Sequence, residues 1–499
     1  MSTRPWSTPA TVALVASSLL VPAREAEAQS IAPTDNAFAL DLYQGTVLAP
    51  GWVTAMGGAY TGYGQGIGAY SVNAAAPAVR HTHSTDWFEL DVDASLSFPL
   101  VLVGNDDVDN SGGSDFDYQG YVYLAGGVNV QLGNLGFGFF GDVQRYSVTF
   151  PPSEAATIVT IGRYHLLAAY QLFGGQLVLG GGARAHSLGV SAPGKTLDPA
   201  LGMFGLAPEA GFLVKPDWSP FRIGVSYRHA VKGLLGSDSG TTVDERGVRR
   251  AGGLIVPNDV AMPWELGLGV AFQVGPRPLN PRWLDPREHE RELDAAHAEK
   301  LALARRRRAN RLEAVPEGPE RETLARGLDQ EQAAEEAEAG RAVERNRARL
   351  KSERRAILND WPREHLLVTA DLLVTGPVER GVSMEAFIGQ GTAPLPSPCM
   401  VVASGASVNL SPRAGLQIEP IPNRVQTRFG SYYEPTRFRY APEACNDRVG
   451  RQHFTFGADV KAFSTRWFGL TDETTYKVQV YGDFAPRYSS IGVGLGVWY

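Results

Sequence analysis

Cysteine is nearly absent from this sequence, with two residues in a chain of 499. Two cysteines are too few for a disulfide-stapled scaffold or for a zinc site built on thiolates. A basic surplus is also missing, because 46 Lys and Arg stand against 53 Asp and Glu and give a formal net charge of −7. Since a nucleic-acid-binding protein usually presents a clustered basic face, we expect no nucleic-acid partner.

Long hydrophobic runs are missing as well. No segment beyond the first 28 residues approaches the roughly 18 uninterrupted apolar residues of a membrane-spanning helix. The mean hydropathy of −0.15 resembles that of a soluble protein, but transmembrane strands that alternate lipid-facing and lumen-facing residues give the same average. Glycine is frequent, with 56 residues, and aromatic residues make up 10%, a composition that favours strands and turns. The averages exclude a bundle of membrane helices and leave a membrane β-barrel open.

Signatures of catalysis are scarce. The sequence contains no G-x-S-x-G, H-E-x-x-H or C-x-x-C motif. His165 and His186 would face the interior of a barrel, but nothing places a serine beside either one, as an acyl hydrolase would require. Asp91, Asp93 and Arg228 are better explained as lumen charges, which the inside of a barrel tolerates. We predict no catalytic residues, no metal site and no cofactor.

The N-terminus has the pattern of a secretory signal peptide. Arg4 precedes an apolar run from Ala10 to Val21, and Ala26-Glu27-Ala28 forms an A-x-A cleavage site. The run of about 12 residues is too short to cross a bilayer as a helix. A buried N-terminal helix is the alternative interpretation. We expect residues 1–28 to be a signal peptide and the mature protein to be exported.

Strict alternation of apolar and polar residues fills much of the remaining chain. In 87–98, Phe88, Leu90 and Val92 alternate with acidic and hydroxyl side chains. A period of two places one set on each face of a sheet. Many of these runs reach about 10–13 residues, which is long for a soluble sandwich, the alternative, and suits a tilted strand that crosses a bilayer. We predict fourteen strands, at about 86–98, 116–132, 135–150, 157–173, 176–191, 203–215, 221–229, 261–274, 364–375, 412–420, 424–433, 453–463, 474–484 and 489–499.

The even strand number and the loop lengths predict a bacterial outer-membrane barrel. Short connections such as Gly133-Asn134 and Gly174-Gly175 alternate with long polar ones such as 237–250, as periplasmic turns alternate with extracellular loops. The predicted fold is all-β, a 14-stranded antiparallel transmembrane β-barrel with an N-terminal plug and an inserted charged helical hairpin. Its parts are the signal peptide 1–28, the plug 29–84, strands 1–8 in 85–281, the insertion 282–358 and strands 9–14 in 359–499.

Both cysteines fall in predicted extracellular loops. Cys399 follows the ninth strand and Cys445 follows the eleventh, so the two loops flank one hairpin. A disulfide between them is plausible in an oxidising, exported setting. Two free thiols are the alternative.

The insertion differs from the rest of the chain. Residues 282–357 contain 18 Lys or Arg and 17 Asp or Glu among good helix formers, and Pro316, Gly318 and Pro319 break the segment into two helices. Val343, Leu350 and Ile357 have heptad spacing. Strand parity places this antiparallel hairpin in the periplasm, where we expect a partner. A solvated or disordered insert without a partner is an equally valid interpretation.

The segment before the first strand resembles the N-terminal signature of the FadL-type outer-membrane transporters. That family has a G-x-A-[YF]-[ST]-G run followed by an Asn-Pro-Ala element, and the similar residues here are Gly57, Gly58, Ala59, Tyr60, Gly62, Asn73 and Pro77. The sequence departs from the pattern where Ala74 follows Asn73 and where 65–68 lack the family's acidic pair. The terminal Tyr499, with its alternating apolar neighbours, resembles the signal that the barrel-assembly machinery reads.

The resemblance implies passive uptake of long-chain fatty acids or other hydrophobic compounds through a plugged barrel in outer-membrane lipid. It also implies lateral release through an opening in the third strand, where Tyr146 and Val148 leave the parity of Phe137 and Phe139. A strand that leaves the bilayer at this point is the alternative explanation of the change. A general diffusion porin and a scaffold that displays the periplasmic hairpin are the alternatives. Candidate ligand contacts are Leu40, Leu42, Tyr43, Leu48, Trp52, Met56 and Tyr60 in the plug and Leu201, Met203, Phe204, Leu234 and Leu235 at the surface.

Overall fold

The computed structural model describes residues 33–498 except for 82–85, 101–104, 106, 111–116, 150–155, 192–200, 236–240, 252–253, 284, 391–402, 439–449 and 466–473. The predicted signal peptide, the predicted disulfide between Cys399 and Cys445 and the predicted role of Tyr499 therefore lie outside the described residues.

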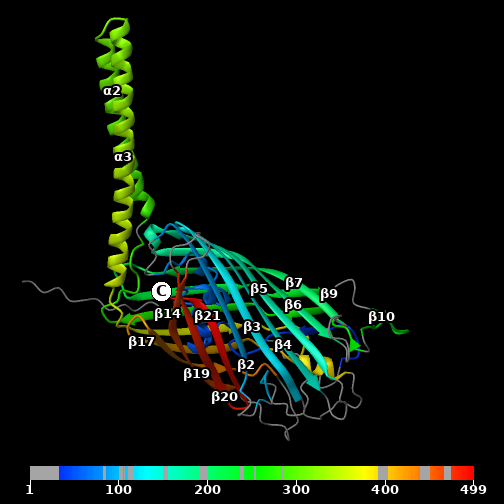
Figure 1. Ribbon diagram of the computed structural model, residues 1–499. Helices are drawn as coiled ribbons and strands as arrows, with labels where there is room; N and C mark the ends of the chain where they lie inside the picture. The colour runs from blue at the N-terminus through cyan, green and yellow to red at the C-terminus, as the bar shows by residue number, and fades with distance from the viewer. Residues whose placement is uncertain are drawn as a thin grey trace, which may run out of the picture.

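Fourteen antiparallel strands form a closed barrel (Figure 1), which confirms the predicted fold. Each strand pairs with its neighbours around the wall, and β21 closes the circle on β2. The wall strands are β2 (Phe88–Pro99), β3 (Asp117–Leu132), β4 (Leu135–Thr149), β5 (Thr157–Leu172), β6 (Leu177–Ser191), β7 (Leu201–Val214), β8 (Phe221–Arg228), β14 (Glu265–Val274), β15 (Leu366–Thr375), β17 (Asn409–Ile421), β18 (Val425–Glu434), β19 (Arg451–Thr465), β20 (Thr474–Ala485) and β21 (Tyr488–Val497).

The alternation in the sequence sorts side chains between the two faces of this wall. On β15, Leu366 and Val368 are exposed on the outside, whereas Thr369 and Asp371 are buried on the inside. A closed barrel satisfies every backbone hydrogen bond of its wall strands, and an apolar outer face with a polar inner face is what a bilayer selects. Among the described residues, no helix is long and apolar enough to cross a membrane.

Two strand predictions need correction. The predicted strand 261–274 is split into β13 (Asp259–Met262) and β14, because Pro263 has no N–H to continue the ladder. The tenth wall strand is β17, which begins at Asn409 rather than at 412. The competing segment Val382–Gly389 forms the short strand β16 (Gly381–Val382) and the helix α4 (Met384–Gly389) instead of a wall strand.

The parity change predicted within 135–150 is not a break in the third strand. β4 alternates strictly between its faces, with Tyr146 and Val148 buried on the inside, where the lumen is apolar. Its pairing with β5 is continuous from Leu135 to Val148. The irregularity lies in β3, where Gly120 and Tyr121 oppose a single β4 residue and Gly120 has a φ of 61°. This is the geometry of a glycine β-bulge.

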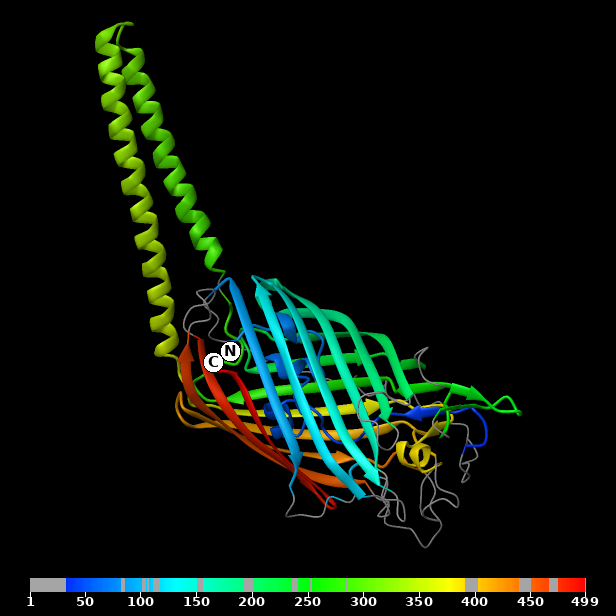
Figure 2. The ribbon, with the colours of Figure 1, turned by 45° about the vertical axis from the view of Figure 1, so that its right-hand side comes forward.

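The segment from residue 33 to residue 81 fills the barrel interior and is the plug (Figure 2). It contains β1 (Ala39–Asp41), α1 (Gly51–Ala55) and the 3₁₀ turns η1 (Ile67–Ser71) and η2 (Ala76–Ala78). β1 pairs in parallel with β13 and β16. Gly62 lies so close to the wall that a Cβ there would be 2.5 Å from the backbone nitrogen of Val270, so the plug can approach the wall at this point only without a side chain.

Two long helices, α2 (Pro286–Glu313) and α3 (Pro319–Asn359), project from one end of the barrel and form the predicted hairpin (Figure 2). Exposed ion pairs join the helices, including Arg305 with Glu336 at 3.2 Å and Arg347 with Asp294 at 3.1 Å. The contact between the helices buries Leu328, whereas Ile357, predicted to continue a heptad seam, is exposed.

The two ends of the barrel differ. The end that carries the hairpin, called here the hairpin end, also has the short β3–β4 turn and the β5–β6 turn with η3 (Phe173–Gly175). The opposite end, called the loop end, carries β9 (Val231–Leu235), β13 and a small sheet of β10 (Thr241–Val243), β11 (Arg249–Ala251) and β12 (Leu254–Ile255), and β10 protrudes in Figure 1.

Candidate functional site

A small apolar pocket lies inside the loop end of the barrel. Leu42 of the plug faces Met203 of β7 and Val260 and Met262 of β13 across a cavity of about 10 Å³. The structure thus brings together two of the predicted ligand contacts, Leu42 and Met203, whereas the side chain of Phe204 is 56% exposed on the outer face of the barrel. The backbone positions of Leu235 and Leu234 on β9 pair with Met203 and Phe204, so the strand that the sequence placed in a surface capture site adjoins this pocket.

A polar cavity of about 80 Å³ lies beside the apolar pocket. Tyr43 and Leu48, both predicted contacts, line it together with a ring of wall charges. At roughly 10–15 Å³ per water molecule the cavity holds several waters, and an extended hydrocarbon chain does not fit. The wall charges are Asp142, Arg163, His165, Arg184, Arg228, Glu265 and Arg413.

The cavity lining has an excess of positive charge. Arg184 pairs with Glu265 at 2.7 Å, Arg163 pairs with Asp142 at 2.7 Å, and His165 contacts Glu209 at 2.8 Å. Arg413 is in none of the ion pairs formed by the described residues, and its nearest polar contact is the hydroxyl of Ser411 at 3.4 Å. Its charge acts on Glu265 and on its register partner Asp371 without forming an ion pair with either. A guanidinium that makes no direct ion pair in a partly buried cavity favours an anionic ligand.

His186 stands at the junction of the pocket and the cavity and lines both. Its side chain is buried, with 6% exposed, and neither ring nitrogen has a hydrogen-bond partner within the described part of the chain. Buried polar atoms are nearly always hydrogen-bonded, so an orphaned imidazole marks a place where a ligand or water belongs. The sequence indicated a lumen-facing histidine but gave no reason to rank it as a ligand contact.

Tyr43 connects the plug to the cavity wall. Its hydroxyl accepts a hydrogen bond from Thr375 at 3.3 Å, and the guanidinium of Arg437 lies 4.6 Å from its ring centroid. Burial raises the pKa of the Tyr43 phenol above its usual value, and the negative charge of Glu265 raises it further. The phenol therefore stays neutral and remains a hydrogen-bond donor at the edge of the cavity.

The other predicted plug contacts pack against the wall rather than into a cavity. Leu40 is fully buried in the core, and the side chain of Met56 adjoins Gly415. The ammonium of Lys477 lies 3.9 Å from the ring centroid of Trp52. Their large buried surfaces hold the plug in place, and Leu201 is likewise a buried core residue.

The residues of the plug signature fasten the plug to the wall. The backbone N–H groups of Tyr60 and Thr61 donate to Asp371 at 2.9 and 2.7 Å. The Asn73 amide donates to the carbonyl of Phe212 on β7 at 3.3 Å, and Gln131 of β3 donates to the Pro77 carbonyl at 2.9 Å. Gly57 and Gly58 have φ values of 62° and 72°, a conformation that side chains disfavour. Ala59 is fully buried beside them.

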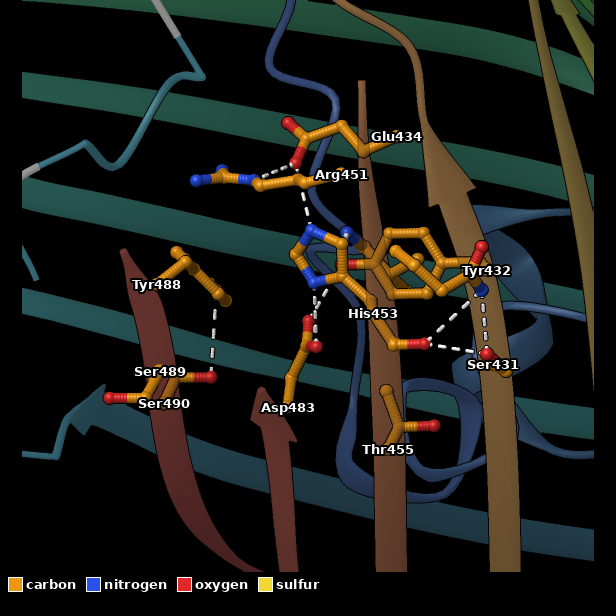
Figure 3. A network of polar contacts seen from close by, with 12 residues as sticks. Ser431, Tyr432, Glu434, Arg451, His453, Thr455, Asp483, Tyr488, Ser489 and Ser490 are labelled. Atoms are coloured by element: carbon orange, nitrogen blue, oxygen red, sulfur yellow. Dashed lines mark hydrogen bonds and ion pairs between the residues drawn. The ribbon is translucent and has the colours of Figure 1, made fainter. Parts of the chain in front are cut away.

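A buried network of charges connects three wall strands, β18, β19 and β20 (Figure 3). The imidazole of His453 contacts Asp483 and Glu434, each at 2.8 Å, and Arg451 also pairs with Glu434. Arg451 donates to the carbonyl of Asp107 at 2.6 Å in the loop after β2. Both ring nitrogens of His453 face carboxylates, so this imidazole cannot activate a serine hydroxyl as a general base.

Tyr432 links this network to the plug. Its hydroxyl donates to Asp483 at 2.7 Å and accepts from the backbone N–H of Val47 at 3.2 Å. The network is therefore a structural clamp between the wall and the plug.

Residues 189–196 match the spacing G-x-x-x-x-G-K-T, which in a phosphate-binding loop connects a strand to a helix. Here the segment follows β6, which pairs with β7 as far as Val190 and Leu201, and 192–196 lie outside the described residues. No cluster of three or more His, Cys, Asp or Glu side chains suited to a metal ion occurs in the described part of the chain.

Comparison with solved structures finds channels. The CymD monoaromatic hydrocarbon channel is 11% identical, with a TM-score of 0.42 over 90% of this chain and 96% of that chain. The deltaS2 mutant of the TodX monoaromatic hydrocarbon channel is 10% identical, with a TM-score of 0.41 over 91% and 98%. The outer-membrane channel DcaP of Acinetobacter baumannii is 8% identical, with a TM-score of 0.27 over 83% and 97%. No protein-family model and no curated protein sequence matches the chain.

The closed barrel with an apolar outer face supports an outer-membrane location and the architecture of an outer-membrane channel.

Proposed function

We propose that this barrel is a passive outer-membrane channel for long-chain fatty acids or other hydrophobic compounds. The observation that carries the proposal is the junction at His186, where an apolar pocket meets a cavity with an excess of cationic side chains. A fatty acid has an apolar chain and an anionic head group, which match the two halves of this site. His186, Arg163 and Arg413 are the head-group ligands in this proposal.

The packed plug distinguishes this proposal from a general diffusion porin. The polar cavity of about 80 Å³ is too small for an acyl chain, so uptake requires the plug to move. A porin instead holds an open water-filled lumen.

Ligand binding by the purified protein tests the head-group site. We expect Arg413→Met to weaken oleate binding about tenfold, because a charge-assisted contact of this kind contributes about 1.5 kcal/mol. Oleyl alcohol, which has the same chain without the charge, should bind the variant and the wild type equally. Arg345→Met, which removes an exposed arginine from α3, is the matched control. Equal losses for oleate and oleyl alcohol, or unchanged binding of both, would contradict a carboxylate site at Arg413.

Lateral release is the finer part of the proposal. We place the exit at the β3–β4 ladder beside the bulge at Gly120, because a bulge interrupts the ladder and weakens pairing locally. Val122 of β3 and Arg145 of β4 are register partners just beyond the bulge, and both face outward.

A reversible cross-link tests this exit. In a Cys399→Ser, Cys445→Ser background, a disulfide between Val122→Cys and Arg145→Cys should abolish oleate uptake, and a reductant should restore it, because the cross-link prevents the strands from parting. The control is the pair Val128→Cys and Phe139→Cys, register partners in the regular part of the same ladder. Uptake that survives oxidation at Val122 and Arg145 would rule out lateral release at this point.

A further inference from the structure

The segment that connects β14 to the hairpin lies across the hairpin end of the barrel. Residues 275–283, called here the hairpin root, leave the wall after Val274 and precede α2. Leu279 and Asn280 of the root are buried, each with 3% exposed. The amide of Asn280 donates to the carbonyls of Ser219 at 2.8 Å and Phe221 at 2.9 Å, at the β7–β8 turn. A connection to an exposed insertion would ordinarily be solvated, whereas this one is packed into the barrel mouth.

One guanidinium joins the root to the plug. Arg222 of β8 is buried and donates to the carbonyl of Tyr63 in the plug at 2.8 Å. The same group donates to the carbonyl of Leu279 at 2.6 Å and to the Asn280 side chain at 2.7 Å. If the root moved away, Arg222 would lose two of its partners while still buried, which is unfavourable. The plug and the root are therefore stabilised by a shared group.

A second contact connects the root to the C-terminal end of the plug. Trp283 of the root lies over the guanidinium of Arg80, 4.2 Å from ring centroid to Cζ. Arg80 closes the plug, since it donates to the carbonyls of Gly133 at 2.9 Å and Trp87 at 2.7 Å. Arg287, in the first turn of α2, stacks on the ring of Trp87 at 3.2 Å. The base of the hairpin thus sits where the plug chain leaves the lumen and enters the first wall strand.

We infer that the hairpin root is a latch that holds the plug in the barrel, and that displacement of the hairpin releases it. The hairpin provides a lever, because the 41 residues of α3 extend about 60 Å at a rise of about 1.5 Å per residue. Movement of the root removes the root partners of Arg222 and the stacking of Trp283 on Arg80 together, so both attachments of the plug are weakened in one step. The latch itself does not depend on what the channel carries, although its use in uptake rests on the proposed function.

Cysteine reactivity measures the latch without any substrate. Gln65 is a buried plug residue near Arg222, and Gln65→Cys in a Cys399→Ser, Cys445→Ser background reports exposure of the plug to a soluble maleimide. We expect Trp283→Ala and Asn280→Ala each to raise the labelling rate about tenfold, because each removes a contact of the root. Arg347→Ala, which breaks an exposed ion pair on the hairpin shaft, is the control and should leave the rate unchanged.

A cross-link that fastens the hairpin gives the opposite test and does not depend on a destabilised variant. Lys351 of α3 lies 3.8 Å from Asp86, beside the first wall strand. The long lysine side chain separates the two backbones by more than a direct disulfide spans, so a bis-methanethiosulfonate bridge, which a reductant removes, joins Lys351→Cys to Asp86→Cys. The bridge should lower the labelling of Gln65→Cys below that of the reduced protein. The inference fails if the root variants label no faster than Arg347→Ala, or if the bridged and the reduced protein label at the same rate. A working latch in a protein that takes up no oleate would overturn the proposed function alone.

Discussion

A single buried lysine at the hairpin end, Lys215, lowers the stability of the folded protein. Lys215 follows β7 directly, is 6% exposed, and belongs to none of the ion pairs found between described residues. Burial and the positive charge of nearby Arg222 lower the pKa of Lys215 from 10.5 to about 7, while Asp217 opposes the shift. The unfolded chain holds this proton more tightly than the folded protein does, so burial of the charged ammonium destabilises the fold.

Lys215→Met should stabilise the protein, and more so at low pH. The folded pKa is about 7 and the unfolded value is 10.5, so the penalty is fully present below pH 7 and disappears as the pH rises to 10.5. We expect a gain of about 2 kcal/mol in the free energy of unfolding at pH 6 and little gain at pH 11. Urea unfolding of the reconstituted protein measures this change in the free energy of unfolding, with Lys300→Met on the exposed face of α2 as the control. A gain that is equal at both pH values would show that the charge is not the cause.

At the residue scale, the sequence predicted the positions of plug residues better than their roles. The resemblance marked Tyr60 and Asn73, and the structure gives both of them anchoring contacts with the wall. The sequence did not single out His186 or Arg413 as ligand contacts. Alternation with a period of two places a side chain on the inner face, but it does not show whether a neighbouring side chain pairs with it. That information depends on the register of β6 and β17 within the closed barrel.

At the scale of elements, the fourteen wall strands follow from alternation, because each strand meets water or plug on one face and lipid on the other. Alternation could not predict the strand ends and bulges that depend on the backbone properties of proline and glycine. Pro263 ends one strand early, and the bulge at Gly120 lies in β3 rather than β4. The parallel pairing of β1 with β13 and β16 could not be predicted either, since no local pattern indicates a contact between residues 39 and 259.

The hairpin depends on few apolar contacts. Its ion pairs are exposed and contribute only about 0–1 kcal/mol each. Leu328 is 4% exposed between α2 and α3, whereas Leu303 is 47% exposed. Both helices were predictable from composition, and their antiparallel register was not, because charges of both signs permit many alignments.

Leu328→Ala should therefore loosen the hairpin and leave the barrel intact. We expect a loss of about 2–3 kcal/mol in hairpin stability, from the lost burial and the cavity left behind. Circular dichroism on heating should show the helical signal lost at lower temperature while the strand signal is unchanged. Leu303→Ala, at an exposed position of α2, should behave as wild type. If the two variants melt alike, Leu328 does not hold the helices together.

At the scale of the whole molecule, one chain combines a lipid-facing wall, a packed plug and a lever outside the barrel. The plug is held on one side by the clamp of His453, Glu434 and Tyr432 and on the other by Arg222 and Arg80. An amphiphile that binds at His186 lies between these attachments. We therefore propose that the loop end selects the ligand and that the hairpin end controls the position of the plug.

Uptake of radiolabelled oleate by cells that lack their own fatty-acid channel tests this account most directly. Cells that express the wild-type protein or Arg345→Met should accumulate oleate with saturation, and cells that express His186→Leu together with Arg413→Met should accumulate it about tenfold more slowly, because the head-group ligands are lost. All three proteins must first be shown to be folded in the outer membrane. Oleate accumulation by the folded wild-type protein no faster than in cells with an empty vector would contradict the central claim.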